Sequence, residues 1–247
     1  MFDVTFHPIK EEELRELIFR PAINSEGGFN KIKDLVIGDD YKGNLDKFFV
    51  YFLTVIKEAP EVKNFDSVTW ACAALAGFLH PYWWGKDTAL KYLPNFEHNF
   101  APFIKSVYDV APEFLPNIEI VRPPVLNDSY AGGGFIPASA VPEFRQILSQ
   151  VVTAQTDFDV ITWSNLVFAL EYAEKNNCGL LETSGVFDCI KGCLTKGENL
   201  RTGISRMNFP VVAISLPDTE DWEKQVEVFL KGDPAEYKKF VLAHLAS

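Results

Sequence analysis

The chain opens with alternating apolar and polar residues and then changes to a helical period. Phe2, Val4 and Phe6 alternate with polar residues over positions 2–9, which is the pattern of a half-buried strand. Residues 11–20 follow with helical spacing and end before a proline, where a helix normally stops. The pattern therefore predicts a strand and then a helix.

Further apolar stripes of helical period predict most of the remaining elements. Residues 45–58 place their apolar side chains on one wide face, which is typical of a helix on a core. Similar spacing predicts helices over five other ranges, namely 67–79, 87–93, 101–110, 140–154 and 160–176. Short apolar runs predict strands at 118–121 and 209–215, and two helices close the chain. We therefore expect an α+β fold, helix-dominated with a few short strands and about ten helices.

One six-residue string occurs twice, 93 positions apart: residues 65–70 read FDSVTW and residues 158–163 read FDVITW. In each copy the aspartate is suited to cap a helix, and the flanking Phe and Trp are suited to a hydrophobic staple. The repeat favours an internal duplication into an N-terminal helical unit with edge strands (1–124) and a diverged C-terminal copy (125–247). The two units either stand apart or pack as one compact domain. Two independent helix starts are the alternative.

The net charge excludes two classes of partner. The chain has 34 acidic and 23 basic residues among its 247, a net charge of −11. A nucleic-acid-binding surface must release counterions from phosphates and needs a basic face, and so does a surface that docks on anionic lipid. We therefore expect neither nucleic acid nor membrane as a partner. The charge is shared almost equally, −5 over 1–124 and −6 over 125–247.

The sequence predicts a cytoplasmic protein with free thiols. Residues 67–85 carry no charge, but Pro81 leaves an apolar part of only about 14 residues, the length of a core helix and not of a membrane span. Asp3 and the acidic residues 11–13 interrupt what would be a secretory signal. Four cysteines are too few for a disulfide framework in a chain of this length. They are Cys72, Cys178, Cys189 and Cys193.

No residue pattern matches a catalytic or metal-binding motif. The Gly132-Gly133-Gly134 run lacks the lysine and hydroxyl residue of a phosphate-binding loop, so we interpret 125–137 as a linker or loop. A close backbone approach to a ligand or partner is the alternative for these glycines. Cys189 and Cys193 share a helical face, but no further motif completes a zinc site, and we interpret them as core thiols. We therefore expect no metal and no cofactor.

Aromatic and acidic residues supply the candidate contact residues. Trp83 and Trp84 follow a proline, and we expect one to face the core and the other a surface or cleft; two core rings are the alternative. Asp39 and Asp40 start no predicted helix, unlike the acidic clusters at 11–13 and 218–223, and could therefore face a basic partner. The complete set of binding candidates is Trp83, Trp84, Asp39, Asp40, Tyr130 and Gly133.

These observations favour a non-enzymatic acidic cytosolic protein that binds a protein partner. Negative charge steers association with a basic partner, and immunity-type antagonists of basic toxins share this acidic, motif-free character. The alternative is a small-molecule-binding protein or an enzyme whose site is assembled from distant residues. Its components would be Trp83, Trp84, His98, Tyr130 and the glycine run. A third interpretation is a scaffold of two helical units. The sequence leaves the oligomeric state open.

Overall fold

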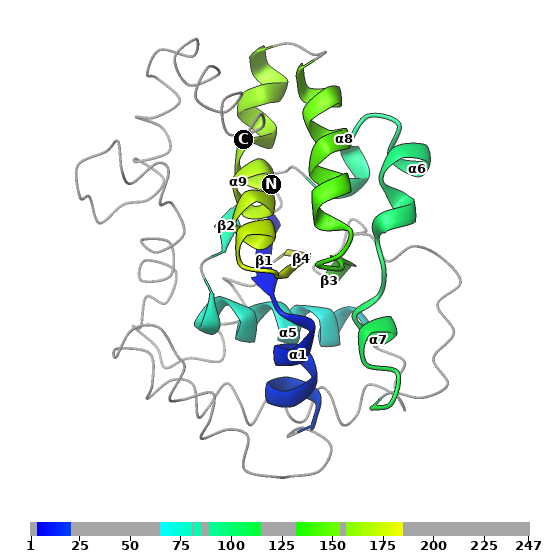
Figure 1. Ribbon diagram of the computed structural model, residues 1–247, viewed down its shortest axis with the longest axis vertical. Coiled ribbons are helices and arrows are strands. Elements are labelled where there is room, and N and C mark those ends of the chain that lie inside the picture. The colour runs from blue at the N-terminus through cyan, green and yellow to red at the C-terminus, as the bar shows by residue number, and fades with distance from the viewer. Residues whose placement is uncertain are drawn as a thin grey trace, which may run out of the picture.

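The computed structural model describes residues 4–20, 65–80, 82–84, 89–114, 132–153 and 157–184. They form a four-stranded antiparallel sheet with helices on both faces, so the predicted α+β class is confirmed (Figure 1). Along the sheet the strand order is β2-β1-β4-β3. The strands are β1 (Val4–Ile9), β2 (Trp83–Trp84), β3 (Gly132–Ile136) and β4 (Gly179–Ser184).

Three long helices and several short ones surround the sheet. The long helices are α5 (Phe65–Leu79), α8 (Val141–Thr153) and α9 (Asp157–Lys175). The N-terminal helix is α1 (Glu11–Glu13), which continues directly into the π-helix η1 (Leu14–Phe19). The other short elements are η3 (Leu90–Tyr92), α6 (Phe96–Asn99), η4 (Ala101–Phe103) and α7 (Val107–Val110). The helices expected near 11–20, 67–79, 140–154 and 160–176 are thus confirmed.

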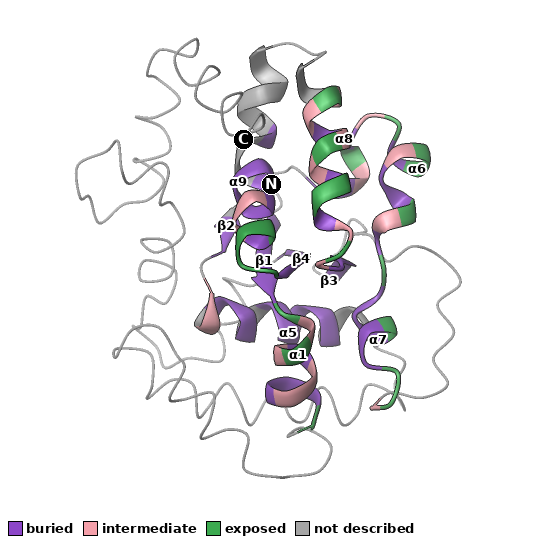
Figure 2. Cartoon of the chain, viewed as in Figure 1, coloured by how far each residue is buried: buried purple, intermediate pink, exposed green. Residues whose placement is uncertain are grey.

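Helices cover both faces of the sheet. α5 contacts β1, β3 and β4 on one face, whereas α9 contacts β1, β2 and β4 on the other and packs beside α8. Because both faces are covered, all six residues of β1 are buried (Figure 2). The prediction of a half-buried strand is therefore wrong about the burial, although it is right about the strand.

The strand register sorts the buried side chains between the two faces. Phe6 lies opposite both Trp83 and Glu182, so these three residues share the face that α8 and α9 cover. His7 lies on the other face, against α5. There the helix comes close because of Gly77, whose missing Cβ would lie 3.1 Å from the ring of Tyr82. Apolar packing and buried polar groups therefore occur together in this sheet.

The glycine run at 132–134 is a strand, so its interpretation as a linker is wrong there. Gly132–Ile136 forms β3 and pairs with β4. A Cβ at Gly133 would collide with the carboxylate of Glu182, so the missing side chain leaves room for a buried neighbour. On the other side of β3, Phe135 exchanges two backbone hydrogen bonds of 2.8 Å with Lys105. The glycines thus serve close packing and strand pairing, which a composition typical of loops did not predict.

The two copies of the repeated string both lie at helix starts, but their aspartates are not caps. α5 begins at Phe65 and α9 at Asp157, so Asp66 and Asp159 lie within the first turns. The interpretation of these aspartates as caps is therefore wrong, whereas the staple stays a prediction, because the side chains of Phe65 and Phe158 are not described. Each predicted half contributes two strands to the single sheet. The duplication itself stays a prediction, because its strands at 118–121 and 209–215 lie outside the described residues, as do the helices expected at 45–58 and at the end of the chain.

The uncharged stretch at 67–79, which the sequence predicts to be a core helix, forms α5. α5 ends at Leu79, and the residues of this helix whose burial is described lie in the core, except for those at its final turn. In the described part of the chain, no helix is both long and apolar enough to cross a membrane. Cys72 of α5 and Cys178 are buried free thiols, as predicted; Cys189 and Cys193 lie outside the described residues.

Candidate functional site

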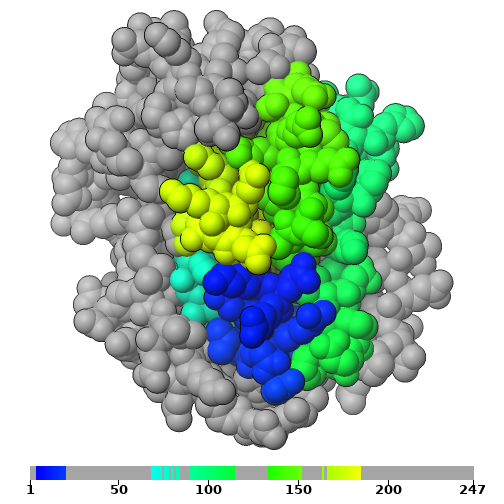
Figure 3. Space-filling model, viewed as in Figure 1, coloured from blue at the N-terminus to red at the C-terminus, as the bar shows by residue number. Residues whose placement is uncertain are grey.

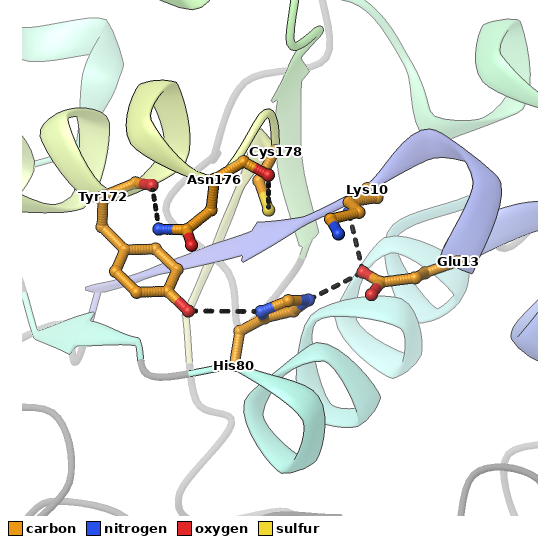
Figure 4. Close-up of polar contacts among 6 residues, drawn as sticks. All are labelled: Lys10, Glu13, His80, Tyr172, Asn176 and Cys178. Atoms are coloured by element: carbon orange, nitrogen blue, oxygen red, sulfur yellow. Dashed lines mark hydrogen bonds and ion pairs between the residues drawn. The ribbon is translucent and has the colours of Figure 1, made fainter. Parts of the chain in front are cut away.

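A group of polar side chains meets at one margin of the sheet, where three segments that are distant in sequence come together (Figure 4). The first segment contributes Glu13. Lys10 directly follows β1 and precedes the first helical turn, and its backbone N–H donates a 2.9 Å hydrogen bond to Glu13 Oε2. A glutamate at this position of a first turn commonly folds back to the cap residue in this way. The bond fixes the carboxylate in front of the helix.

The second segment contributes His80, the residue that follows α5. Its backbone N–H continues the helical pattern by donating to Ala76 O at 2.8 Å. Its side chain is 13% exposed, and its Nε2 lies 2.7 Å from Glu13 Oε2. A neutral imidazole that donates Nε2–H to the carboxylate keeps Nδ1 as an acceptor. Glu13 therefore orients the ring and selects this tautomer.

The third segment is the end of α9. Tyr172 OH lies 3.5 Å from His80 Nδ1, a long contact, and the two rings meet edge to face with centroids 6.3 Å apart. After the helix, Asn177 adopts a positive φ of 53° and the Cys178 N–H donates to Ala173 O at 2.8 Å. This arrangement is a Schellman motif, which ends a helix and redirects the chain. It leads directly into β4 and holds Tyr172 beside β1 and β2.

The directions of the pKa shifts show that Glu13 is ionised, whereas Tyr172 and Cys178 are neutral. Burial raises the pKa of Glu13, but hydrogen bonds from His80 and Lys10, together with their positive charges, outweigh it and leave the pKa below its ordinary value. Burial, together with nearby Cys178 and Glu13, raises the pKa of Tyr172. Burial and the charge of Glu13 raise the pKa of Cys178 to about 12 despite the opposing charge of Lys10. The phenol and thiol are therefore protonated at neutral pH.

This chemistry suits a structural contact better than a catalytic site. A cysteine nucleophile needs a lowered pKa, and that of Cys178 is raised. Nε2 of His80 is engaged by Glu13, and Nδ1 faces Tyr172. Both ring nitrogens thus face groups of the chain itself. No cluster of three or more metal-ligating side chains occurs among the described residues.

A second polar region lies inside the sheet. His7 is fully buried, its ring stacks on Tyr82 with centroids 4.5 Å apart, and its Nε2 lies 2.8 Å from Thr5 Oγ1. Burial lowers the pKa of His7 to about 3. On the opposite face the buried Glu182 accepts a 2.6 Å hydrogen bond from the Leu90 N–H. This region is closed to solvent, so it forms part of the core.

The structure places only some of the residues predicted from sequence, and it does not gather them into one site. Trp83 is 3% exposed and packs against Tyr172 with ring centroids 5.4 Å apart, so it belongs to the core and not to a contact surface. Trp84 lies in the edge strand β2, and Gly133 is buried in β3. His98 is exposed on α6. Asp39, Asp40 and Tyr130 lie outside the described residues.

Sequence reasoning missed His80 and Tyr172 as interacting residues. Glu13 had a visible signal, since it stands at the third position of a predicted helix, where capping glutamates occur. The contact between His80 and Tyr172 joins positions 92 residues apart and leaves no local pattern. Figure 3 shows that segment 4–20 and the end of α9 reach the same face of the molecule.

The described residues include more acidic than basic side chains, 14 against 7. The three arginines in the described part of the chain pair with acidic side chains: Arg15 with Glu113 at 3.4 Å, Arg20 with Glu16 at 2.8 Å and Arg145 with Glu174 at 2.7 Å. The exposed acids Glu12, Glu97 and Glu143 form no ion pair with another described residue. These acids are therefore accessible to a partner.

One large apolar side chain is exposed among the described residues. Tyr92, at the end of η3, is 55% exposed, and the Lys91 ammonium lies 4.9 Å from the centre of its ring. The neighbouring helix α6 carries the exposed Glu97, and Phe100 at its end packs against Phe144 of α8 with centroids 4.9 Å apart. An exposed tyrosine and free carboxylates thus lie on adjacent elements.

Comparison with known proteins finds no match: no family model fits the chain, and no characterised protein or solved structure is significantly similar to it.

Proposed function

We propose that this protein is a non-enzymatic acidic protein that acts by binding a basic protein partner. The carrying observation is that the described arginines, Arg15, Arg20 and Arg145, are engaged by acids of the same chain, whereas Glu12, Glu97 and Glu143 are exposed without an ion pair among the described residues. Free carboxylates on a surface of net negative charge accelerate encounter with a basic partner and discourage acidic ones. The cytoplasmic location expected from the sequence is part of this proposal.

Tyr92 and Glu97 are the contact residues that we propose first. Tyrosine is enriched among the residues that carry binding energy at interfaces, because it buries a large rigid ring and still offers a hydroxyl. Tyr92 is 55% exposed, and Glu97 is exposed on the adjacent helix α6. Together they offer an apolar anchor beside negative charge. The predicted candidates Asp39, Asp40, Trp84 and Tyr130 remain part of the proposal, whereas the buried Trp83 and Gly133 do not.

The test compares capture of a partner by matched variants in a native lysate. We expect the wild-type chain to retain a basic protein at low salt and to release it at high salt, because surface charges are screened. Glu97→Lys and Tyr92→Ala should each weaken retention about tenfold. Glu12→Lys makes the same charge change in the first turn of another short helix, so a smaller loss there than in Glu97→Lys separates the contact at Glu97 from the general loss of negative charge. Capture that is insensitive to salt and equal in all variants would contradict the proposal.

An immunity-type antagonist of a basic toxin is the finer form of this proposal. It predicts that a gene adjacent to the one for this chain encodes a basic toxic protein. Co-expression of the two proteins should restore growth, and co-expression with the Glu97→Lys variant should restore less. Growth that depends on neither protein would argue against the antagonist and would leave partner binding to be judged by the capture experiment.

The alternative, a small-molecule site or an enzyme built from distant residues, has one specific observation in its favour. Glu13, His80 and Tyr172 do come from distant segments and form a carboxylate–imidazole–phenol series. General acid–base chemistry uses such groups, but it requires a nitrogen or oxygen that can reach a substrate. If the chain turns over a small-molecule substrate, and His80→Gln loses that activity while it still captures the partner, the result would favour this alternative.

A further inference from the structure

The Glu13–His80–Tyr172 series connects the starts and ends of three structural elements. Glu13 is the last residue of α1, His80 follows α5, and Tyr172 lies in the last turn of α9. Side chains at such positions restrain how the elements lie relative to one another. A change in either contact therefore acts on the segment that directly follows Glu13.

That segment is the π-helix η1, which is an uncommon conformation. Its end is closed by the Arg20 N–H donating to Arg15 O, five residues back. π-Helical turns are rare and are found frequently at functional positions. Leu14, Leu17, Ile18 and Phe19 of this segment are buried, so its displacement would expose apolar surface. The position of η1 thus depends both on its packing and on the residues that anchor its start.

We propose that Glu13, His80 and Tyr172 form a pH-responsive clasp that fixes the start of η1 against the ends of α5 and α9. The clasp is independent of the partner-binding function proposed above. It holds most tightly when His80 carries a proton and Glu13 does not. It is weaker when His80 is neutral, and it opens when Glu13 is protonated.

The proton balance follows from the donors and acceptors on each group. Neutral His80 donates Nε2–H to Glu13 and accepts at Nδ1 from the Tyr172 hydroxyl. After gaining a proton at Nδ1, the ring donates to both neighbours and carries a positive charge 2.7 Å from the carboxylate. Hydrogen bonds between charged partners are shorter and stronger than neutral ones. Protonation of His80 therefore strengthens the clasp.

The other titratable groups at this margin are Lys10, Tyr172 and Cys178 among the described residues. Lys10 places a positive charge near Glu13. Tyr172 and Cys178 stay neutral across the relevant range because burial raises the pKa of both. A change of charge within the clasp therefore arises at His80 or at Glu13.

The experiment measures amide hydrogen exchange by NMR in the full chain. Protection of the amides of residues 15–20, corrected for intrinsic exchange, is compared with that of residues 145–152 in α8 between about pH 8 and about pH 5.5, the range in which histidines titrate. We expect relative protection at 15–20 to rise about fivefold as the pH falls. His98→Gln, which changes an exposed histidine of α6, should show the same rise. His80→Gln retains a donor but gains no proton, so its profile should be flat.

A measurement on the wild-type chain decides the question without relying on a variant. The ring ¹⁵N shifts of His80 report its protonation, and their midpoint should coincide with the midpoint of the protection change. Coinciding midpoints, together with a flat profile in His80→Gln, support the clasp. Different midpoints, a flat wild-type profile or an unchanged rise in His80→Gln would overturn it, and the midpoints decide alone if His80→Gln does not fold.

Discussion

His7 in β1 and His80 after α5 each lie beside a tyrosine ring, yet only His80 has a carboxylate within hydrogen-bonding distance. His7 stacks on Tyr82 and is fully buried, and its pKa is lowered to about 3. His80 meets Tyr172 edge to face and lies 2.7 Å from Glu13, with 13% of its side chain exposed. The interior of the sheet therefore excludes a proton, whereas its margin offers a negative partner for one.

This difference shows that polar groups in the interior of the sheet and polar groups at its margin have different kinds of partner. Inside the sheet, His7 and Glu182 contact hydroxyl or backbone groups and add to the packing of the core. At the margin, Glu13 and His80 contact each other and some solvent, so their charges can change without burying a new ion. Acid should therefore change the stability of the two regions through different groups.

The largest change in the free energy of unfolding should come from His7 as the pH is lowered. Its pKa in the folded chain is about 3, against 6.5 for a free histidine, so the unfolded chain binds the proton first as the pH falls. Between these values the free energy of unfolding should drop by about 1.4 kcal/mol per pH unit from this group alone. His7→Gln should reduce that slope in urea unfolding curves, whereas His98→Gln should not. Equal slopes in wild type and His7→Gln would show that His7 is accessible to protons.

Removal of the Glu182 carboxylate should have the next largest effect. Glu182→Ala takes away the acceptor of the Leu90 N–H and leaves a cavity in the core, which should lower the free energy of unfolding by about 3 kcal/mol. Glu182→Gln keeps a carbonyl oxygen and should lose less than half of that. Chemical denaturation at neutral pH measures both. A loss in Glu182→Gln as large as that in Glu182→Ala would show that the charge, and not the acceptor, matters.

An alanine at Gly133 should lower the free energy of unfolding by about 2 kcal/mol, because its Cβ collides with the Glu182 carboxylate. The same substitution in a Glu182→Ala background should be less harmful, since the carboxylate is absent. A double-mutant cycle of denaturation curves measures this coupling. Additive losses would indicate that Gly133 is required for its backbone and not for the space it leaves.

Substitutions at the margin of the sheet should lower the free energy of unfolding the least. Glu13→Gln weakens a bond to His80, and we expect a loss of about 1 kcal/mol at neutral pH. The pKa of Glu13 is lowered in the folded chain, so its contribution is present above the ordinary glutamate range and is lost as the pH falls through its folded pKa. Tyr172→Phe removes only a 3.5 Å contact and should cost below about 0.5 kcal/mol. Thermal unfolding at several pH values measures both, and a Tyr172→Phe loss above that of Glu13→Gln would contradict this order.

Much of the fold could be predicted from local patterns. The helices expected at 67–79, 140–154 and 160–176 agree with α5, α8 and α9 to within a few residues, because each is a sustained segment rich in apolar residues. The strand β4 was missed, since Leu180 and Leu181 are followed by Glu182, Thr183 and Ser184, which resemble a polar loop. All six of its residues are buried because β1 and β3 flank it and helices cover it. No local pattern contains that information.

The candidate site was predictable only in part, for the same reason. Glu13 follows a helix-start rule that acts over three residues, so its position near Lys10 is a local property. Trp83, by contrast, could not be placed from its neighbours in sequence. It resembled a contact residue because it follows a proline, but the packing of β2 against α9 buries it. His80 gains its partners from segments 67 and 92 residues away.

The sequence by itself determined where the long helices and β1 form, that the surface is acidic, and that a glutamate caps the first turn. These properties depend on neighbours within a few positions, where side-chain spacing and backbone hydrogen bonding act. Tertiary structure alone decided that His7 is buried without a carboxylate and that His80 receives one. The pairing of β1 with β4 and the covering helices set burial at each position, and burial lowers the pKa of His7, whereas the ring of His80 is oriented by the carboxylate of Glu13.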